Sequence, residues 1–66
     1  MQIVLNGQPR DYPDPLTVSA LLLTAGYGER RVAVEVNREI VAKSRHASHV
    51  LAEGDQVEII QAIGGG

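Results

Sequence analysis

The chain of 66 residues contains no cysteine, no phenylalanine and no tryptophan, and two tyrosines are its only aromatic residues. The lack of cysteine excludes a disulfide framework, a thiolate metal site and a thiol nucleophile, so we expect a protein of the reducing cytoplasm. No apolar run approaches the roughly 18 residues of a membrane-spanning helix. No basic segment precedes the apolar residues that follow Met1. We therefore expect neither a membrane partner nor a signal peptide.

Positive charge is also scarce, with six Lys and Arg against eight Asp and Glu and a formal net charge of −2. A nucleic-acid-binding domain needs a basic stripe, and a single-strand binder also needs aromatic side chains on which bases stack. We therefore expect no nucleic-acid partner. The basic residues from position 30 onward are interpreted as a solvated surface, and a partner with an acidic rim is the alternative. These residues are Arg30, Arg31, Arg38, Lys43 and Arg45.

Apolar patterning predicts a β-hairpin at the start of the chain. Residues 3–5 form an apolar strand, and the Asn6-Gly7 pair that follows is typical of a type I′ turn, because both residues tolerate positive φ. The returning strand over residues 8–12 contains Pro9. Because proline cannot donate to a sheet ladder, this strand is expected at an edge of the sheet.

A helix is predicted over residues 18–25. Thr17 is suited to cap its N-terminus, because the hydroxyl accepts a hydrogen bond from a free backbone N–H of the first turn. Val18, Leu21 and Leu22 form one apolar stripe at helical spacing. Gly26 occupies the position of a left-handed C-cap.

The second half of the chain predicts three more strands. Alternation of apolar and polar residues favours a half-buried strand over residues 32–36. A turn at Asn37-Arg38 leads to a short return strand over 39–41. A tight turn at residues 53–55 precedes the last strand, which is predicted over residues 56–63.

The stretch 42–52 between these strands is polar and is expected to be irregular, with Val50 and Leu51 as anchors in the core. The strands over 3–5 and 56–63 have the least interrupted apolar runs, which is typical of central strands. We therefore predict an α+β fold in which these two strands pair in parallel at the centre of one sheet and one helix packs across it.

Histidines and carboxylates are the candidate catalytic or metal-binding groups. His46 and His49 lie three residues apart near two serines. A metal site needs three or four ligands and no third one is evident, so we interpret both histidines as part of a solvated loop and expect no metal. A Ser-His-Asp triad would need more scaffold than this chain has. Glu53, Asp55 and Glu58 are interpreted as turn and surface residues, because acid-base catalysis by paired carboxylates needs an enclosing cleft.

Gly64, Gly65 and Gly66 follow the last predicted strand. Glycine is costly to order and packs nothing, so such a tail contributes nothing to folding. Without Cβ atoms, these residues are able to thread a narrow channel and present the carboxylate of Gly66 to an enzyme, whereas a frayed or engineered terminus is the alternative. We expect residues 1–63 to form one domain and residues 64–66 a flexible tail.

Five segments of the sequence match a known family. They are Val-Leu-Asn-Gly at 4–7, Thr-Val with Leu-Leu at 17–22, Ala-Val-Glu-Val-Asn-Arg-Glu-Ile-Val at 33–41, Gly-Asp-Gln-Val-Glu-Ile at 54–59 and Ala-Ile-Gly-Gly-Gly at 62–66. With these segments the chain resembles, along nearly all its length, the ThiS family, the small ubiquitin-like sulfur carrier proteins of thiamine biosynthesis.

The resemblance implies a β-grasp fold with a mixed sheet of four to five strands, and the role of a carrier, not an enzyme. It implies that an E1-like adenylyltransferase uses ATP to adenylate the carboxylate of Gly66. Sulfur relayed by a cysteine desulfurase then gives a thiocarboxylate, from which thiazole synthase takes the sulfur. Gly64 and Gly65 would thread the partners' active sites, and no bound cofactor is implied.

The last strand also suggests where the activating enzyme docks. Ile60 interrupts the alternation of this strand and is expected to place apolar surface on the outward face of the sheet. Together with Glu58, Ala62 and Ile63 it forms the predicted docking surface. The prediction rests on the usual anatomy of protein interfaces, in which polar groups surround an apolar centre.

Three other functions fit the same pattern. The nearest is the small subunit of molybdopterin synthase, which uses the same Gly-Gly thiocarboxylate but is usually longer. A protein-modifying ubiquitin-like tag would instead be joined to a lysine amine. A β-grasp interaction module whose glycines are inert is the third alternative.

Overall fold

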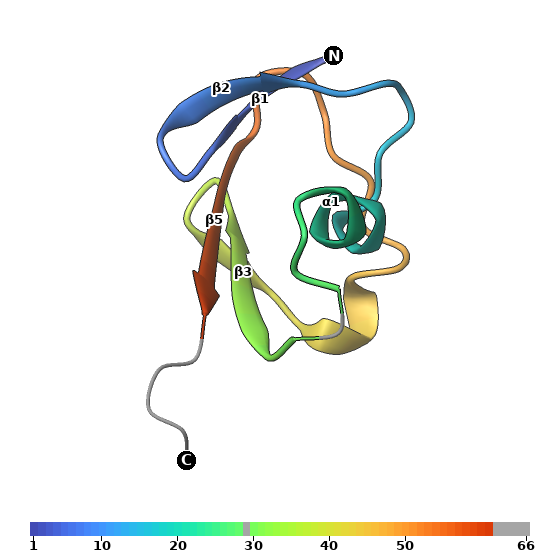
Figure 1. Ribbon diagram of the computed structural model, residues 1–66, viewed down its shortest axis with the longest axis vertical. Helices are drawn as coiled ribbons and strands as arrows, with labels where there is room; N and C mark the ends of the chain where they lie inside the picture. Colours follow the sequence, from blue (N-terminus) through green and yellow to red (C-terminus); the bar gives the residue numbers. More distant parts are fainter. Residues whose placement is uncertain (29, 62–66) are drawn as a thin grey trace.

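The helix α1 lies across one face of a five-stranded mixed sheet (Figure 1). The computed structural model describes residues 1–28 and 30–61. The elements are β1 (Gln2–Leu5), β2 (Gln8–Asp11), α1 (Val18–Thr24), β3 (Val32–Val36), β4 (Glu39–Val41), the 3₁₀ helix η1 (Lys43–Arg45) and β5 (Gln56–Gln61). None of the helices in this described part is long and apolar enough to cross a membrane.

The strands lie in the order β2-β1-β5-β3-β4. β1 and β5 pair in parallel, with Val4 opposite Gln56, and the other neighbours are antiparallel. The predicted central pairing of the first and last strands is therefore confirmed. The strand that contains Pro9 is an edge strand, also as predicted, so the missing N–H of the proline weakens no interior ladder.

Two hairpins share one turn geometry. In the first turn, Asn6 and Gly7 have φ values of 49° and 81°, which is the predicted type I′ conformation. Asn37 and Arg38 join β3 to β4 with φ values of 52° and 70°. The sequence pattern predicts a turn at this second place but not its type, because arginine rarely adopts a positive φ.

Both ends of α1 are closed by local hydrogen bonds. The hydroxyl of Thr17 accepts from Ala20 N at 3.1 Å, which confirms the predicted cap. The helix ends at Thr24, one residue earlier than expected. Beyond it, Tyr27 N donates to Leu22 O at 2.9 Å and Gly26, with φ of 91°, takes the left-handed position after the helix.

The core lies between α1 and the inner face of the sheet. Val18 and Leu21 are fully buried and Leu22 nearly so, which confirms the predicted apolar stripe. These residues pack with side chains from the sheet and from the loops around it. They are Ile3, Leu5, Leu16, Val34, Val36, Val41, Leu51, Val57 and Ile59.

The segment between β4 and β5 differs from the expectation in two respects. It contains the 3₁₀ helix η1 instead of being irregular throughout. Leu51 is buried as predicted, but the prediction for Val50 is wrong, since 58% of its surface is exposed. Val50 forms an isolated bridge with Thr17, and Leu51 N donates to Leu16 O at 2.8 Å. In such an extended segment neighbouring side chains point to opposite sides, so only one of the two reaches the core.

Candidate functional site

The candidate site is the C-terminal end of β5. On one side of this strand, β3 pairs with it as far as Val32 opposite Gln61. On the other side, β1 ends at Leu5, and Asn6 continues the contact: its backbone N–H donates to Val57 O at 2.9 Å and its side-chain Oδ1 accepts from Ile59 N at 2.8 Å. The sheet therefore holds β5 from both sides up to Ile59 and from the β3 side up to Gln61.

The predicted reactive tail lies beyond this point. Gln61 is the last residue of β5 and of the part that the structure describes. The residues assigned to the tail and to one end of the docking surface lie outside the described residues, and their roles stay predictions. They are Ala62, Ile63, Gly64, Gly65 and Gly66.

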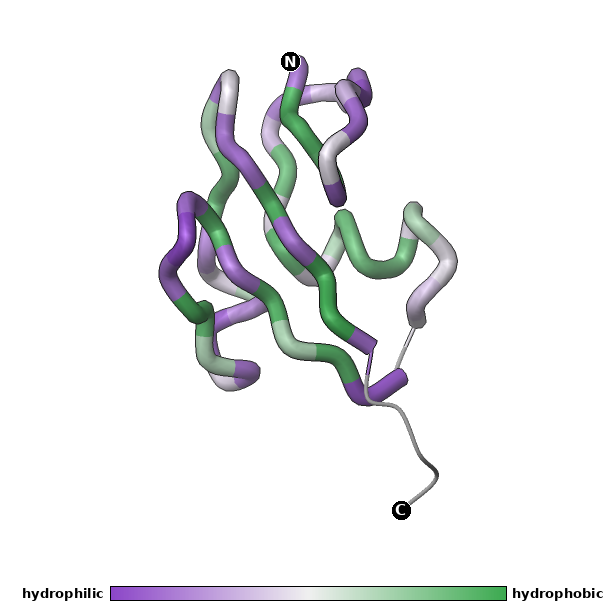
Figure 2. Tube along the Cα trace, turned by 90° about the vertical axis from the view of Figure 1, so that its left-hand side faces the viewer, coloured by the Kyte–Doolittle hydropathy of each residue, from purple (hydrophilic) through white to green (hydrophobic). Residues whose placement is uncertain are grey.

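The outward face of β5 carries the two other predicted docking residues. Val57 and Ile59 are buried, whereas Glu58 and Ile60 between and after them are exposed. The alternation of hydrophobic and hydrophilic residues along neighbouring strands is visible in Figure 2. Ile60 is 49% exposed, which confirms that it places apolar surface on the outward face. Its role in docking stays a prediction.

Three further residues join this face, and the sequence analysis missed them. Ala33 lies opposite Ile60 and Glu35 lies opposite Glu58 on β3, while Ile40 of β4 lies opposite Glu35. Ile40 is 69% exposed. We call these five residues the outer patch. The alternation of the strands indicates which residues face outward, but only the register of β3 with β4 and β5 brings them together.

The histidines are placed differently from the expectation. His46 is 7% exposed and its Nε2 lies 3.0 Å from Val41 O, so the interpretation of a solvated side chain is wrong for this residue. η1 turns the chain so that the ring faces the end of β4. His49 is half-buried. Across residues 1–28 and 30–61, no three His, Asp or Glu side chains form a group that could hold a metal ion.

The carboxylates before β5 act in the turn, as interpreted from the sequence. Glu53 accepts from Gln2 N at 3.0 Å and Asp55 accepts from Ala52 N at 2.8 Å. The other oxygen of Asp55 accepts from Asn37 Nδ2 at 3.0 Å, and Asn37 Oδ1 in turn accepts from Gln56 N at 2.9 Å. These bonds fix the start of β5, at the opposite end from the candidate site.

Comparisons with known structures agree with this architecture. The crystal structure of the thiamine biosynthesis protein ThiS from Geobacter metallireducens superposes with a TM-score of 0.86 at 29% sequence identity, and the match covers 100% of both chains. The predicted β-grasp fold is therefore confirmed. The outer patch and the end of β5 belong to a fold that this solved protein shares.

Comparisons of sequence reach the same group of proteins. The model of the ThiS family matches residues 3–66. The thiazole synthase of Paramagnetospirillum magneticum is 47% identical over 66 residues, although the chain spans only 20% of that protein. The sulfur carrier protein ThiS of Escherichia coli is 33% identical over 66 residues, with 100% of both chains covered. This chain belongs to the ThiS family.

Proposed function

We propose that this chain is a sulfur carrier of thiamine biosynthesis that holds sulfur as a thiocarboxylate at Gly66. The observation that carries the proposal is the match of residues 3–66 to the ThiS family, with Gly64, Gly65 and Gly66 separated by only two residues from Gln61, where the central strand β5 ends. A carrier needs a rigid body that partners recognise and a thin terminus that enters their active sites.

The partner enzymes carry out the chemistry, and the chain contributes only its terminal carboxylate. A carboxylate is a poor electrophile, so an E1-like adenylyltransferase joins the carboxylate of Gly66 to AMP from ATP and releases pyrophosphate. A persulfide supplied through a cysteine desulfurase then displaces AMP and gives an acyl disulfide, and a thiol reductant cleaves its S–S bond to leave the thiocarboxylate and a disulfide of the donor. The absence of cysteine suits this role, because the carrier has no thiol of its own to join this exchange. The carrier supplies no catalytic side chain and binds no cofactor.

The outer patch supports a docking role in the first step. Ile40 and Ile60 provide exposed apolar area, and Glu35 and Glu58 lie between them. An apolar surface of this kind with charged neighbours is typical of a protein interface. We propose that the activating enzyme binds here, with Ala62 and Ile63 extending the contact toward its active site.

Thiazole synthase is the proposed acceptor of the sulfur. A thiazole synthase that is 47% identical to this chain over 66 residues supports the assignment to the thiazole branch over molybdopterin synthesis. The thiocarboxylate sulfur is a soft nucleophile, and a tail without side chains allows it to reach an enclosed active site.

Intact mass spectrometry tests the proposal. The chain is incubated with its activating enzyme, ATP, a persulfide donor and a thiol reductant and is then weighed. We expect a mass gain equal to the exchange of one oxygen for one sulfur, located at Gly66 by fragmentation. A variant with one residue added after Gly66 is the control and should gain nothing. If the wild-type chain neither gains this mass nor causes AMP release, the carrier function is wrong.

A further inference from the structure

Asn6 hydrogen-bonds β5 through its side chain at the point where β1 has ended. Along this parallel pair, Val4 N donates to Asp55 O at 2.9 Å. Farther along both strands, Asn6 N donates to Val57 O, also at 2.9 Å. The next donor of the evenly spaced ladder is Ile59 N, and Asn6 Oδ1 accepts from it at 2.8 Å. Because the backbone turns away at Asn6, where φ is 49°, the side-chain oxygen takes the place of a strand carbonyl.

The turn itself does not require asparagine at this position. A type I′ turn needs positive φ at both central residues, which Asp-Gly and Gly-Gly provide as well as Asn-Gly. Asn37 occupies the same position in the turn between β3 and β4, with φ of 52°, and its Oδ1 accepts from Gln56 N at 2.9 Å. Both hairpins therefore place an amide oxygen on a backbone N–H of β5, Asn37 at the start of the strand and Asn6 near its end.

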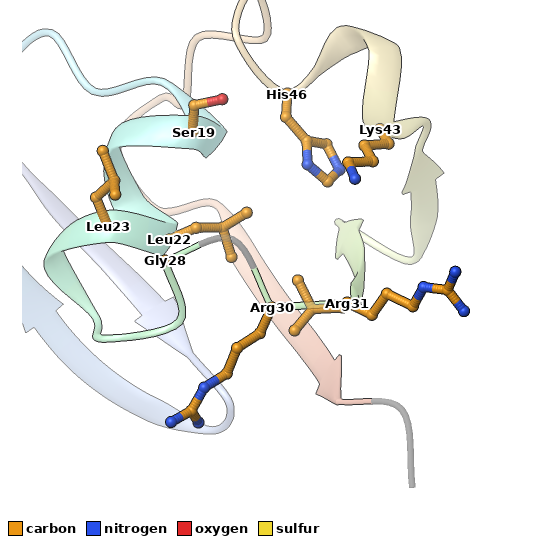
Figure 3. A pocket seen from close by; sticks show the side chains of 9 residues that line it. Ser19, Leu22, Leu23, Gly28, Arg30, Arg31, Lys43 and His46 are labelled. Atoms are coloured by element: carbon orange, nitrogen blue, oxygen red, sulfur yellow. The ribbon is translucent and has the colours of Figure 1, made fainter. Parts of the chain in front are cut away.

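On the β1 side, the end of β5 has little other support. No strand that the structure describes pairs with β5 on this side after Val57, whereas β3 continues on the other side to the end of β5. In the described part of the chain, Asn6 is also the only residue whose side chain hydrogen-bonds the backbone of the last three residues of β5. The segment before β3 passes close to this end of β5, but the side chains of Arg30 and Arg31 extend away from each other (Figure 3). The bond from Asn6 is therefore the side-chain contact that secures this end of the strand.

This support matters because the last residues of β5 lead into the tail. Gln61 is followed by the five residues that end in Gly66. Fixing the backbone of a residue costs conformational entropy, so a partner need not order again the residues that the sheet already holds. Without the Asn6 bond, the activating enzyme would have to order the end of β5 as well as the tail. Since the positioning of a reacting group contributes large factors to a rate, the reaction at the carboxylate of Gly66 should then slow.

We propose that Asn6 is a positioning residue for the reaction at Gly66. Through its bond to Ile59 it keeps the end of β5 in the sheet, so the tail starts from a fixed point when the activating enzyme receives it. The inference rests on the proposed function. Docking itself should depend little on Asn6, because four of the five residues of the outer patch lie on β3, on β4 or before Ile59.

Asn37 provides a matched control within the same chain. Asn6→Gly and Asn37→Gly both allow the positive φ, and each removes an amide oxygen from a backbone N–H of β5. Asn37→Gly also removes the bond to Asp55, so it should lower the stability at least as much. Only Asn6→Gly releases the end of the strand next to the tail. Asn6→Asp keeps an acceptor oxygen in a turn that Asp-Gly also forms, so it should restore the function.

The kinetics of the first turnover test the inference. Activating enzyme and ATP are mixed rapidly with increasing concentrations of carrier, and pyrophosphate release is followed at a temperature at which urea unfolding shows every variant to be folded. Asn6→Gly should lower the maximal rate about tenfold and change the half-saturating carrier concentration by less than about twofold. Asn37→Gly should keep the maximal rate within about twofold of wild type, and Asn6→Asp should recover it to within about threefold.

Amide hydrogen exchange of the carrier alone tests the structural part of the inference. The ratio of the exchange rate of Ile59 N–H to that of Gln56 N–H should rise about tenfold in Asn6→Gly and fall in Asn37→Gly. The ratio is the informative quantity, because a general loss of stability speeds the exchange of both amides alike. Asn6→Asp should have a ratio close to that of wild type.

The outcomes separate this inference from the proposed function. The inference is overturned if Asn6→Gly keeps the wild-type maximal rate, if Asn37→Gly is slowed as much, if Asn6→Asp recovers nothing, or if the exchange ratio does not change. It is also overturned if Asn6→Gly changes only the half-saturating concentration, since Asn6 would then act in docking. A wild-type chain that is not adenylated overturns the proposed function and this inference with it, whereas an active wild-type chain with an equally active Asn6→Gly variant overturns the inference alone.

Discussion

Glu35 and Glu58 lie directly opposite each other in the antiparallel pairing of β3 and β5. Like charges in such a cross-strand pair repel, because their Cβ atoms are only about 4.5–5.5 Å apart. The described residues around them on this face, Ala33, Ile40 and Ile60, bring no positive charge. Stability alone does not account for two carboxylates there, which supports the proposal that this face docks a partner, one whose contacting surface carries positive charge.

Glu58→Gln should therefore make the fold more stable and the docking weaker. Removal of one charge relieves the repulsion and should raise the free energy of unfolding by about 0.2–1 kcal/mol. Urea unfolding measures this gain, which should shrink in about 1 M salt. Glu39→Gln is the control, since Glu39 lies opposite Val36 and should give no gain. A gain of equal size in both variants would exclude the Glu35–Glu58 repulsion as its cause.

Ile60→Asp should weaken docking of the activating enzyme while the fold is kept. Ile60 is 49% exposed on the outer patch, so a carboxylate there places a charge where an apolar contact is proposed. We expect the rate of adenylation at low carrier concentration to fall about tenfold or more. Val50→Asp introduces the same charge at a residue that is 58% exposed away from the patch and should change little. Adenylation of Ile60→Asp at the wild-type rate would show that the patch does not dock this enzyme.

Leu22 and Leu23 allow the phase of α1 to be tested with two identical truncations. Leu22 is 6% exposed in the core, and Leu22→Ala should lower the free energy of unfolding by about 2–5 kcal/mol. Leu23 is 68% exposed, and Leu23→Ala should change it by less than about 0.5 kcal/mol. Thermal or urea unfolding measures both. Similar losses in the two variants would mean that the helix presents a different face to the sheet.

The sequence predicts the local features of this fold well because they depend on residues close together in the chain. The turn at Asn6-Gly7, the Thr17 cap and the stripe of α1 each follow from one short segment. The outer patch depends on register between strands far apart in sequence, and alternation alone does not give that register. The buried position of His46 is missed for a different reason: its contact with Val41 O is only five residues away in the chain but depends on the turn of η1, and the polar stretch 42–52 gives no periodic signal for that turn.

Asn6 has a long-range role that the Asn-Gly turn pattern does not predict. The pattern predicts only a turn residue, but Asn6 Oδ1 also accepts from Ile59 N, 53 residues away, at 2.8 Å. Asn6→Gly keeps the positive φ and removes the acceptor, so the free energy of unfolding should fall by about 1–3 kcal/mol. Asn6→Asp keeps an acceptor oxygen and should lose less. Equal losses in urea unfolding would show that the bond to Ile59 contributes nothing to stability.

Gly65→Val should abolish activation without a change in stability. The residue lies outside the described part of the chain, and the prediction follows from the chemistry of a tail that must enter an enclosed active site. A β-branched side chain widens the tail and confines its backbone to a smaller range of φ and ψ than glycine allows.

Gly64→Ala is the control, because Gly64 is one residue farther from the reacting carboxylate and should tolerate a methyl group. Intact mass spectrometry after incubation with the activating enzyme, ATP, a persulfide donor and a thiol reductant should show the gain of sulfur for Gly64→Ala and none for Gly65→Val. Normal conversion of Gly65→Val would mean that no enzyme channel encloses this position.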